Sequence, residues 1–169
     1  AVAAAIFAIL VYVWFRFEWQ FGLGAVVALV HDVISTIGIF ALLGLEFNLS
    51  TVAAILTIAG YSINDTVVVY DRVRENLRRY KTMNMTDLLN KSINETLSRT
   101  VMTSVTTLLA LLSLYLLGGE VISGFSFAMI WGVIVGTYSS ICLAVPLLLY
   151  LNVSRRSGDM SGEATTEEA

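Results

Sequence analysis

The sequence has few cysteine, proline and charged residues. Its 169 residues include one cysteine, one proline and one histidine, and only 14% are charged. A single cysteine, Cys142, excludes an internal disulfide. Soluble domains carry about 25% charged residues, so the low charge argues against an ordinary soluble domain. The first residues also lack the basic segment with which a secretory signal peptide begins.

Hydrophobic residues instead make up 57% of the sequence, and its mean hydropathy is +0.79. Several apolar runs approach the roughly 20 residues that a helix needs to cross a bilayer. We therefore predict an all-α, polytopic transmembrane helix bundle in residues 1–151, with a cytoplasmic helical loop. The first apolar run begins at residue 1, so we expect the chain to be part of a longer protein. The five expected spans are about residues 1–15, 21–45, 49–70, 101–117 and 125–151.

The positions of the basic residues predict the topology. All ten Lys and Arg residues follow an odd-numbered span, beginning with Arg16. Because basic residues favour the cytoplasmic side, we expect residues 71–100 and the C-terminus to be cytoplasmic. Thr86 is expected to cap a separate helix at residues 86–100. The polar tail, residues 152–169, is expected to be disordered.

Two carboxyl groups lie inside expected spans, where charge is unfavourable. On insertion scales a carboxylate at the bilayer centre costs about 2.5–3.5 kcal/mol. At about 1.5 Å per residue, Asp65 lies about 10 Å from the cytoplasmic edge and Asp32 about 16 Å inside its span. Intramembrane charges usually pair or face a wet cavity. We therefore interpret Asp65 as functional, whereas Asp32 and its neighbour His31 can be functional or structural.

The fourth expected span offers a partner for Asp65. Arg99 lies at its cytoplasmic end, and the helical period places Thr103 and Thr106 on the same face. The guanidinium can either reach into the bundle or extend to the lipid headgroups. For Asn64 and Thr106 a hydrogen bond to a neighbouring helix is the simpler role. The polar residues expected to support the site are His31, Tyr61, Ser62, Asn64, Thr66, Thr103 and Thr106.

The fifth expected span contains residues suited to close packing. Gly132 and Gly136 form a G-x-x-x-G spacing, which lets two helices approach closely. Pro146 is expected to kink this helix near its end, where the cost is smaller. No catalytic or metal-binding residue set is predicted from the sequence.

The stretch GYSINDTVVVYDRVREN (60–76) resembles the signature of the SecF branch of the SecD/SecF family, which belongs with the resistance-nodulation-division superfamily. That family has six transmembrane helices and a periplasmic domain between the first two. The resemblance implies helices two to six here, without the first helix and that domain. It also implies that the family's intramembrane acid is Asp65 and its functional arginine Arg99. Further similar segments, in the same order, are Trp14–Trp19, Ala28–Val33, Glu46–Ser50, Ser92–Thr100, Gly118–Phe125 and Gly136–Ser140.

The same resemblance implies a function in protein export at the bacterial inner (plasma) membrane. The expected partners are SecD, the SecYEG channel, the translocating preprotein and membrane lipids, with no nucleic acid. Protons would be the coupling ion, no cofactor is expected, and Asp65, Arg99 and Asp32 would form the proton relay. One alternative is a scaffold that only assembles SecD with the channel. A remote one is an intramembrane aspartyl protease, although Asp65 follows IN rather than the GxG of such enzymes.

Overall fold

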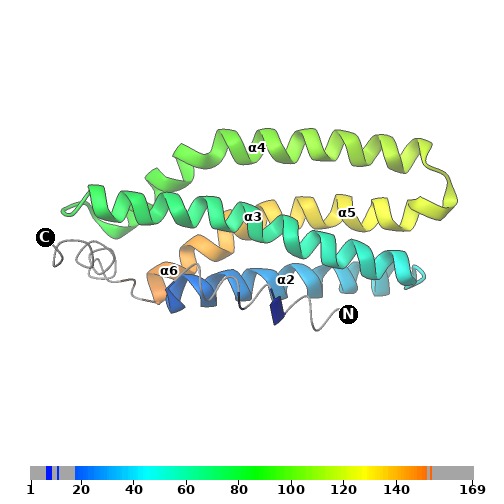
Figure 1. The fold of residues 1–169 in the computed structure, drawn as a ribbon, viewed down its shortest axis with the longest axis horizontal. Coiled ribbons are helices and arrows are strands. Elements are labelled where there is room, and N and C mark those ends of the chain that lie inside the picture. The colour runs from blue at the N-terminus through cyan, green and yellow to red at the C-terminus, as the bar shows by residue number, and fades with distance from the viewer. Residues whose placement is uncertain (1–6, 9–10, 12–17, 152, 154–169) are drawn as a thin grey trace, which may run out of the picture.

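The computed structural model describes residues 7–8, 11, 18–151 and 153, and every regular element in this part of the chain is a helix. The all-α prediction is therefore confirmed for these residues. Helix α3 crosses the middle of the bundle, where it contacts α2, α4 and α5 (Figure 1). In chain order the elements are α2 (Trp19–Leu43), α3 (Leu49–Arg79), α4 (Met85–Leu117), α5 (Glu120–Ser139), the π-helix η1 (Ser140–Ala144) and α6 (Val145–Tyr150).

Four helices of the described part are long and apolar enough to cross a membrane. They are α2, α3, α4 and the continuous helix formed by α5, η1 and α6, and they match the second to fifth expected spans. The expected first span, residues 1–15, lies outside the described residues except for positions 7–8 and 11. The expected tail, residues 152–169, lies outside them except for position 153.

The segment between the third and fourth expected spans differs from the prediction. Helix α3 continues to Arg79, and α4 runs without interruption from Met85 to Leu117. The separate helix capped by Thr86 is therefore wrong: the N-cap of α4 is Asn84, and the helix enters the apolar span directly. Residues 86–101 contain no glycine or proline, so a continuous helix satisfies all their backbone groups.

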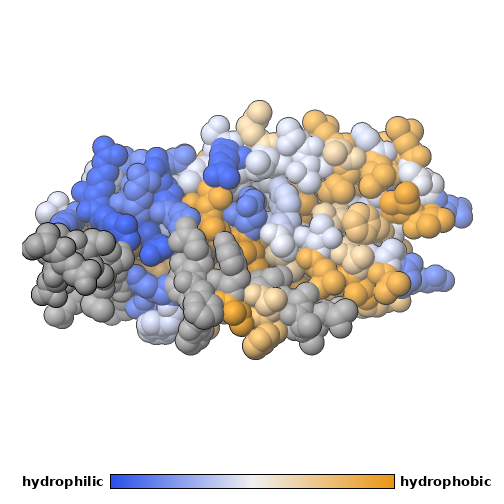
Figure 2. All heavy atoms as spheres, in the orientation of Figure 1, coloured by the Kyte–Doolittle hydropathy of each residue, from blue (hydrophilic) through white to orange (hydrophobic). Residues whose placement is uncertain are grey.

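Hydrophilic and apolar residues lie at different parts of the surface. The hydrophilic ones gather over the turn that joins α3 to α4, and apolar ones cover much of the rest of the face in view (Figure 2). A bundle in lipid exposes this pattern, because apolar side chains contact acyl chains and charged ones reach water. The charged residues of this end are Asp71, Arg72, Arg74, Glu75, Arg78, Arg79, Lys81, Asp87, Lys91 and Glu95.

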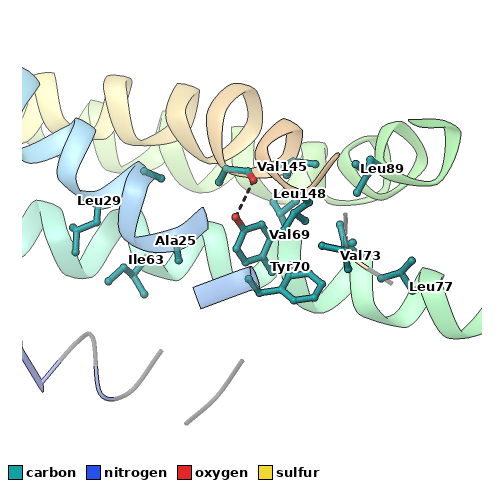
Figure 3. Packing of buried hydrophobic residues seen from close by; sticks show 14 of the residues in the cluster. Ala25, Leu29, Ile63, Val69, Tyr70, Val73, Leu77, Leu89, Val145 and Leu148 are labelled. Atoms are coloured by element: carbon teal, nitrogen blue, oxygen red, sulfur yellow. Dashed lines mark hydrogen bonds between the residues drawn. The ribbon is translucent and has the colours of Figure 1, made fainter. Parts of the chain in front are cut away.

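Tyr70 stabilises the packing of α3 against the π-helical turn. It is fully buried, and its hydroxyl donates a hydrogen bond to the Ala144 carbonyl at 2.9 Å (Figure 3). Its ring meets Phe21 edge to face, with 5.2 Å between centroids. A Cβ at position 24 would overlap the Tyr70 hydroxyl, so Gly24 permits this contact. Pro146 follows the π-helical turn and has no N–H to donate to an earlier carbonyl.

Gly132 and Gly136 lie where α5 contacts α3. A Cβ at Gly132 would overlap the side chain of Ile58, whereas one at Gly136 would only touch the Ser62 Cβ at 3.4 Å. The backbone of α5 therefore approaches α3 most closely at Gly132.

We expect Gly132→Leu to destabilise the bundle by about 1–3 kcal/mol, because overpacking forces side chains and backbone apart. Thermal unfolding in detergent measures this loss. Shortening the opposing side chain, Ile58→Ala, should recover part of the stability of Gly132→Leu, and Gly136→Ala should have a smaller effect. Equal effects of substitutions at the two glycines would contradict the close contact.

Candidate functional site

Asp32 joins three helices through a buried carboxyl group. Its side chain on α2 is 0% exposed. Its Oδ2 accepts hydrogen bonds from Ser62 Oγ of α3 at 2.5 Å and from Ser139 Oγ of α5 at 2.8 Å. Its Oδ1 lies 3.0 Å from His31 Nδ1. Because both oxygens have partners, burying this group costs less than burying an unpaired carboxyl group.

His31 contacts Asp32, although successive residues of a helix point about 100° apart. Its ring is half-buried, and the contact is between neighbours on the same helix.

A second polar contact lies one turn along α3. Thr66 Oγ1 is 3.0 Å from the Oγ of Ser140, and Ser140 is the first residue of the π-helical turn. Ser140 Oγ also lies 3.5 Å from the Ser62 carbonyl. The hydroxyl-bearing residues before and within the π turn thus face the polar side of α3. π-helical turns are frequent at functional sites.

Asp65 lies between these contacts in the sequence of α3, but its environment differs from that of Asp32. It is 4% exposed, and its Oδ2 has no hydrogen-bond partner among the described residues. Arg99 is exposed on α4. No ion pair of 4.0 Å or less joins the described side chains of Asp65 and Arg99. Direct pairing, one of the two arrangements that the sequence allowed, is absent from this structure.

The inward face of α4 is not the predicted one. Thr103 and Thr106 are exposed, and their hydroxyls donate to backbone carbonyls of their own helix at 2.8–3.0 Å. A helical period shows which residues share a face but not which face packs inward, and α4 has hydroxyl groups on several faces. From residue 96 to its end, the buried polar residues of α4 are Thr96, Thr100 and Ser104.

Ser104 connects α4 to two other helices. It accepts a hydrogen bond from the Tyr61 hydroxyl of α3 at 3.5 Å, and its Oγ lies 2.7 Å from Thr137 Oγ1 of α5. Asn64, by contrast, is exposed. The structure therefore brings Tyr61, Ser62 and Thr66 into inter-helix contacts and leaves Asn64 outside them.

Four residues that complete these contacts were not predicted from the sequence. Three of them fall among four consecutive positions, 137–140, inside an apolar span. This cluster of hydroxyl groups was the signal that could have identified them. Ser104 gave no signal, because it is one of several hydroxyl residues on α4. In the described residues, no group of three or more His, Cys, Asp or Glu side chains could hold a metal ion. The four missed residues are Ser104, Thr137, Ser139 and Ser140.

Long apolar helices with buried carboxyl groups between them define the class as a polytopic membrane protein. Over residues 1–154 the sequence matches the family described as "Protein export membrane protein SecD/SecF, C-terminal". The chain belongs to this family.

Two curated relatives are both named protein translocase subunit SecF. The protein of Cereibacter sphaeroides is 59% identical over 169 residues, which are 100% of this chain and 52% of the relative. The protein of Rhodobacter capsulatus is 62% identical over 155 residues, 92% of this chain and 46% of the relative. The chain thus spans about half the length of these relatives.

A solved structure has the same helical arrangement. A chain of "Crystal structure of SecDF in Super-membrane-facing form" is 50% identical and superposes with a TM-score of 0.82. The match covers 91% of this chain and 21% of that one. Together with the SecF relatives, this similarity identifies the chain as part of a translocase subunit of the SecF type.

Proposed function

We propose that this part of the protein couples proton flow across the bacterial inner membrane to late steps of polypeptide translocation. It would act with SecD on the preprotein in the SecYEG channel. Protons are the coupling ion, and the proton-relay residues are Asp65, Arg99 and Asp32. The proposal rests mainly on Asp65, which is buried in a long apolar helix and has one oxygen, Oδ2, without a hydrogen-bond partner among the described residues.

Asp65 suits proton uptake and release because two opposing influences can act on it. Its Oδ2 is buried without a hydrogen-bond donor among the described residues, so a negative charge there has no compensation from a hydrogen bond. A guanidinium that moves close to this oxygen would compensate that charge. A shift of α4 that brings Arg99 closer therefore promotes proton release, and separation promotes uptake. One charge moving through 100 mV supplies about 2.3 kcal/mol, which is enough to bias two helix arrangements.

Asp32 is the proposed second station of the relay. Its partner Ser62 precedes Asp65 by one helical turn on α3, so the two carboxyl groups lie near the same level of the bundle. Its remaining oxygen contacts His31, whose ring is half-buried. This arrangement gives Asp32 a titratable neighbour on the outer side and hydroxyl groups on the inner side.

The proposed orientation places the turn between α3 and α4 in the cytoplasm. Its support is the basic character of that end, together with the positive-inside bias. Protons would then enter from the opposite, periplasmic side, where the connections are short, and leave beside Arg99. The C-terminus would share the cytoplasmic side.

Aspartyl protease chemistry fits the site poorly. It requires two carboxyl groups that share one proton. Asp32 instead bonds to Ser62 and Ser139, and the Oδ2 of Asp65 has no partner among the described residues.

The test measures translocation in membrane vesicles that contain the full-length subunit, SecD and the SecYEG channel. We expect the subunit to stimulate late translocation when a proton-motive force is present, and a protonophore to abolish this stimulation. If the stimulation persists unchanged after the proton-motive force has collapsed, the chain acts as a scaffold and the coupling proposal is wrong.

A further inference from the structure

Polar side chains join α3 and α4 at their charged ends. Asn76 on α3 is 2% exposed, and its Nδ2 donates to Ser92 Oγ at 2.9 Å and to Glu95 Oε2 at 2.8 Å, both on α4. Arg72 Nε, one turn away on α3, lies 2.8 Å from the same Glu95 oxygen. Lys91 adds a longer contact to Glu95 Oε1 at 3.4 Å. One carboxylate of α4 is thus held by two side chains of α3.

This set of contacts fixes how the two helices are aligned. They run antiparallel, joined by the turn after Arg79 (Figure 1). Glu95 precedes Arg99 by one turn of α4, and Arg72 follows Asp65 by two turns of α3. The level of Arg99 relative to Asp65 is therefore set by where Glu95 is held on α3.

Another polar contact between the described residues of these helices lies on the far side of the proton site. It is the 3.5 Å hydrogen bond from Tyr61 to Ser104. This bond is longer than those of Asn76, and Ser104 has a shorter contact with Thr137. The stronger constraint on the alignment is therefore the one at Asn76. A slip of one helical turn, about 5.4 Å, would change the separation of Asp65 and Arg99 by a comparable distance.

We propose that Asn76 and Glu95 are positioning residues for the proton site. They hold α4 in the register in which Arg99 can approach and leave Asp65. The inference rests on the proposed coupling function, since positioning matters only if Asp65 and Arg99 carry protons. The two residues touch neither reacting group, and they act through the alignment of α3 and α4.

The test uses the full-length subunit with SecD and the SecYEG channel in liposomes. Asn76→Leu removes the donor and keeps the branched shape of the side chain, and Glu95→Gln is milder, because its amide oxygen can still accept from Asn76. The exchange variant combines Asn76→Asp with Glu95→Gln, so that the new amide donates to the new carboxylate. Glu75→Gln is the matched control, since Glu75 pairs with Arg72 within α3 only.

Two readouts are compared for every variant. One is translocation with and without a proton-motive force. The other is the distance between spin labels at the exposed positions Thr57 and Met102, one on each helix, in a cysteine-free background that includes Cys142→Ala. We expect Asn76→Leu to broaden the distance distribution and lose most proton-dependent translocation, and Glu95→Gln to lose part. The exchange variant should recover both readouts, and Glu75→Gln should resemble the parent protein.

Several outcomes would overturn the inference. One is a changed label distance with full proton-dependent translocation. Another is a loss of translocation in both single variants with unchanged distances. Failure of the exchange variant to restore either readout would also contradict it. Asp65→Asn is measured in parallel: if it keeps full proton-dependent translocation, the proposed function itself fails, whatever the Asn76 variants show.

Discussion

Asp65→Asn is expected to abolish the proton-dependent part of translocation while the protein still folds and assembles with SecD. Asparagine has nearly the same shape as aspartate but cannot exchange a proton in the physiological range. Because Oδ2 of Asp65 has no partner among the described residues, the substitution should break no hydrogen bond of that oxygen. Translocation with a proton-motive force should then fall to the level seen without it, measured in vesicles with matched amounts of subunit.

Thr57→Val is the control for this variant. Thr57 is exposed on the same helix, and its hydroxyl bonds only to a carbonyl of α3 at 2.9 Å. We expect the control to retain both stability and proton-dependent translocation. Normal coupling in Asp65→Asn would exclude Asp65 as the proton carrier, and loss of assembly with SecD would make its role structural.

Asp32→Leu is expected to destabilise the bundle, because it removes the buried acceptor of the Ser62 and Ser139 hydroxyls, and only Ser139 has a second acceptor among the described residues, the Gly136 carbonyl at 3.1 Å. Leaving buried donors unsatisfied costs about 1–3 kcal/mol, although hydrogen bonds between membrane helices average only about 0.6 kcal/mol. We therefore expect a loss of at least about 1 kcal/mol, measured by chemical or thermal unfolding in detergent. Asp32→Asn keeps an acceptor oxygen and should retain most of the stability.

The two Asp32 variants also separate a structural role from a proton station. If Asp32 carries protons, Asp32→Asn should lower proton flux although the protein stays folded. Unchanged flux in this variant would leave Asp32 as a structural link between helices. Thr36→Val is the matched control, since Thr36 is also buried on α2 but bonds only to the Asp32 backbone carbonyl at 2.8 Å.

The helices were largely predictable from the sequence because their signal is local. Runs of apolar residues bounded by polar ones predicted the bounds of α2 to within a few residues. They also predicted the apolar parts of α3, α4 and the last helix. The burial of Asp32 and Asp65 followed from the low tolerance of such spans for carboxylates. The long-range partners of these residues were less predictable, because they depend on how neighbouring helices rotate about their axes.

Helix α4 illustrates this limit. Its hydroxyl groups lie at several angles, so its period alone did not show that Ser104 turns inward and that Thr103 and Thr106 turn outward. Packing against α3 and α5 decides that rotation. The contact of Asp32 with Ser139, 107 positions along the chain, depends on the same kind of arrangement.

Infrared difference spectroscopy between protonated and deprotonated states tests the central claim most directly. The sample is the full-length subunit with SecD in lipid, and the signal is the C=O stretch of a protonated carboxyl group. We predict a pH-dependent band that disappears in Asp65→Asn and persists in Thr57→Val. An identical carboxyl spectrum in Asp65→Asn and the parent protein, at every pH, would contradict the account.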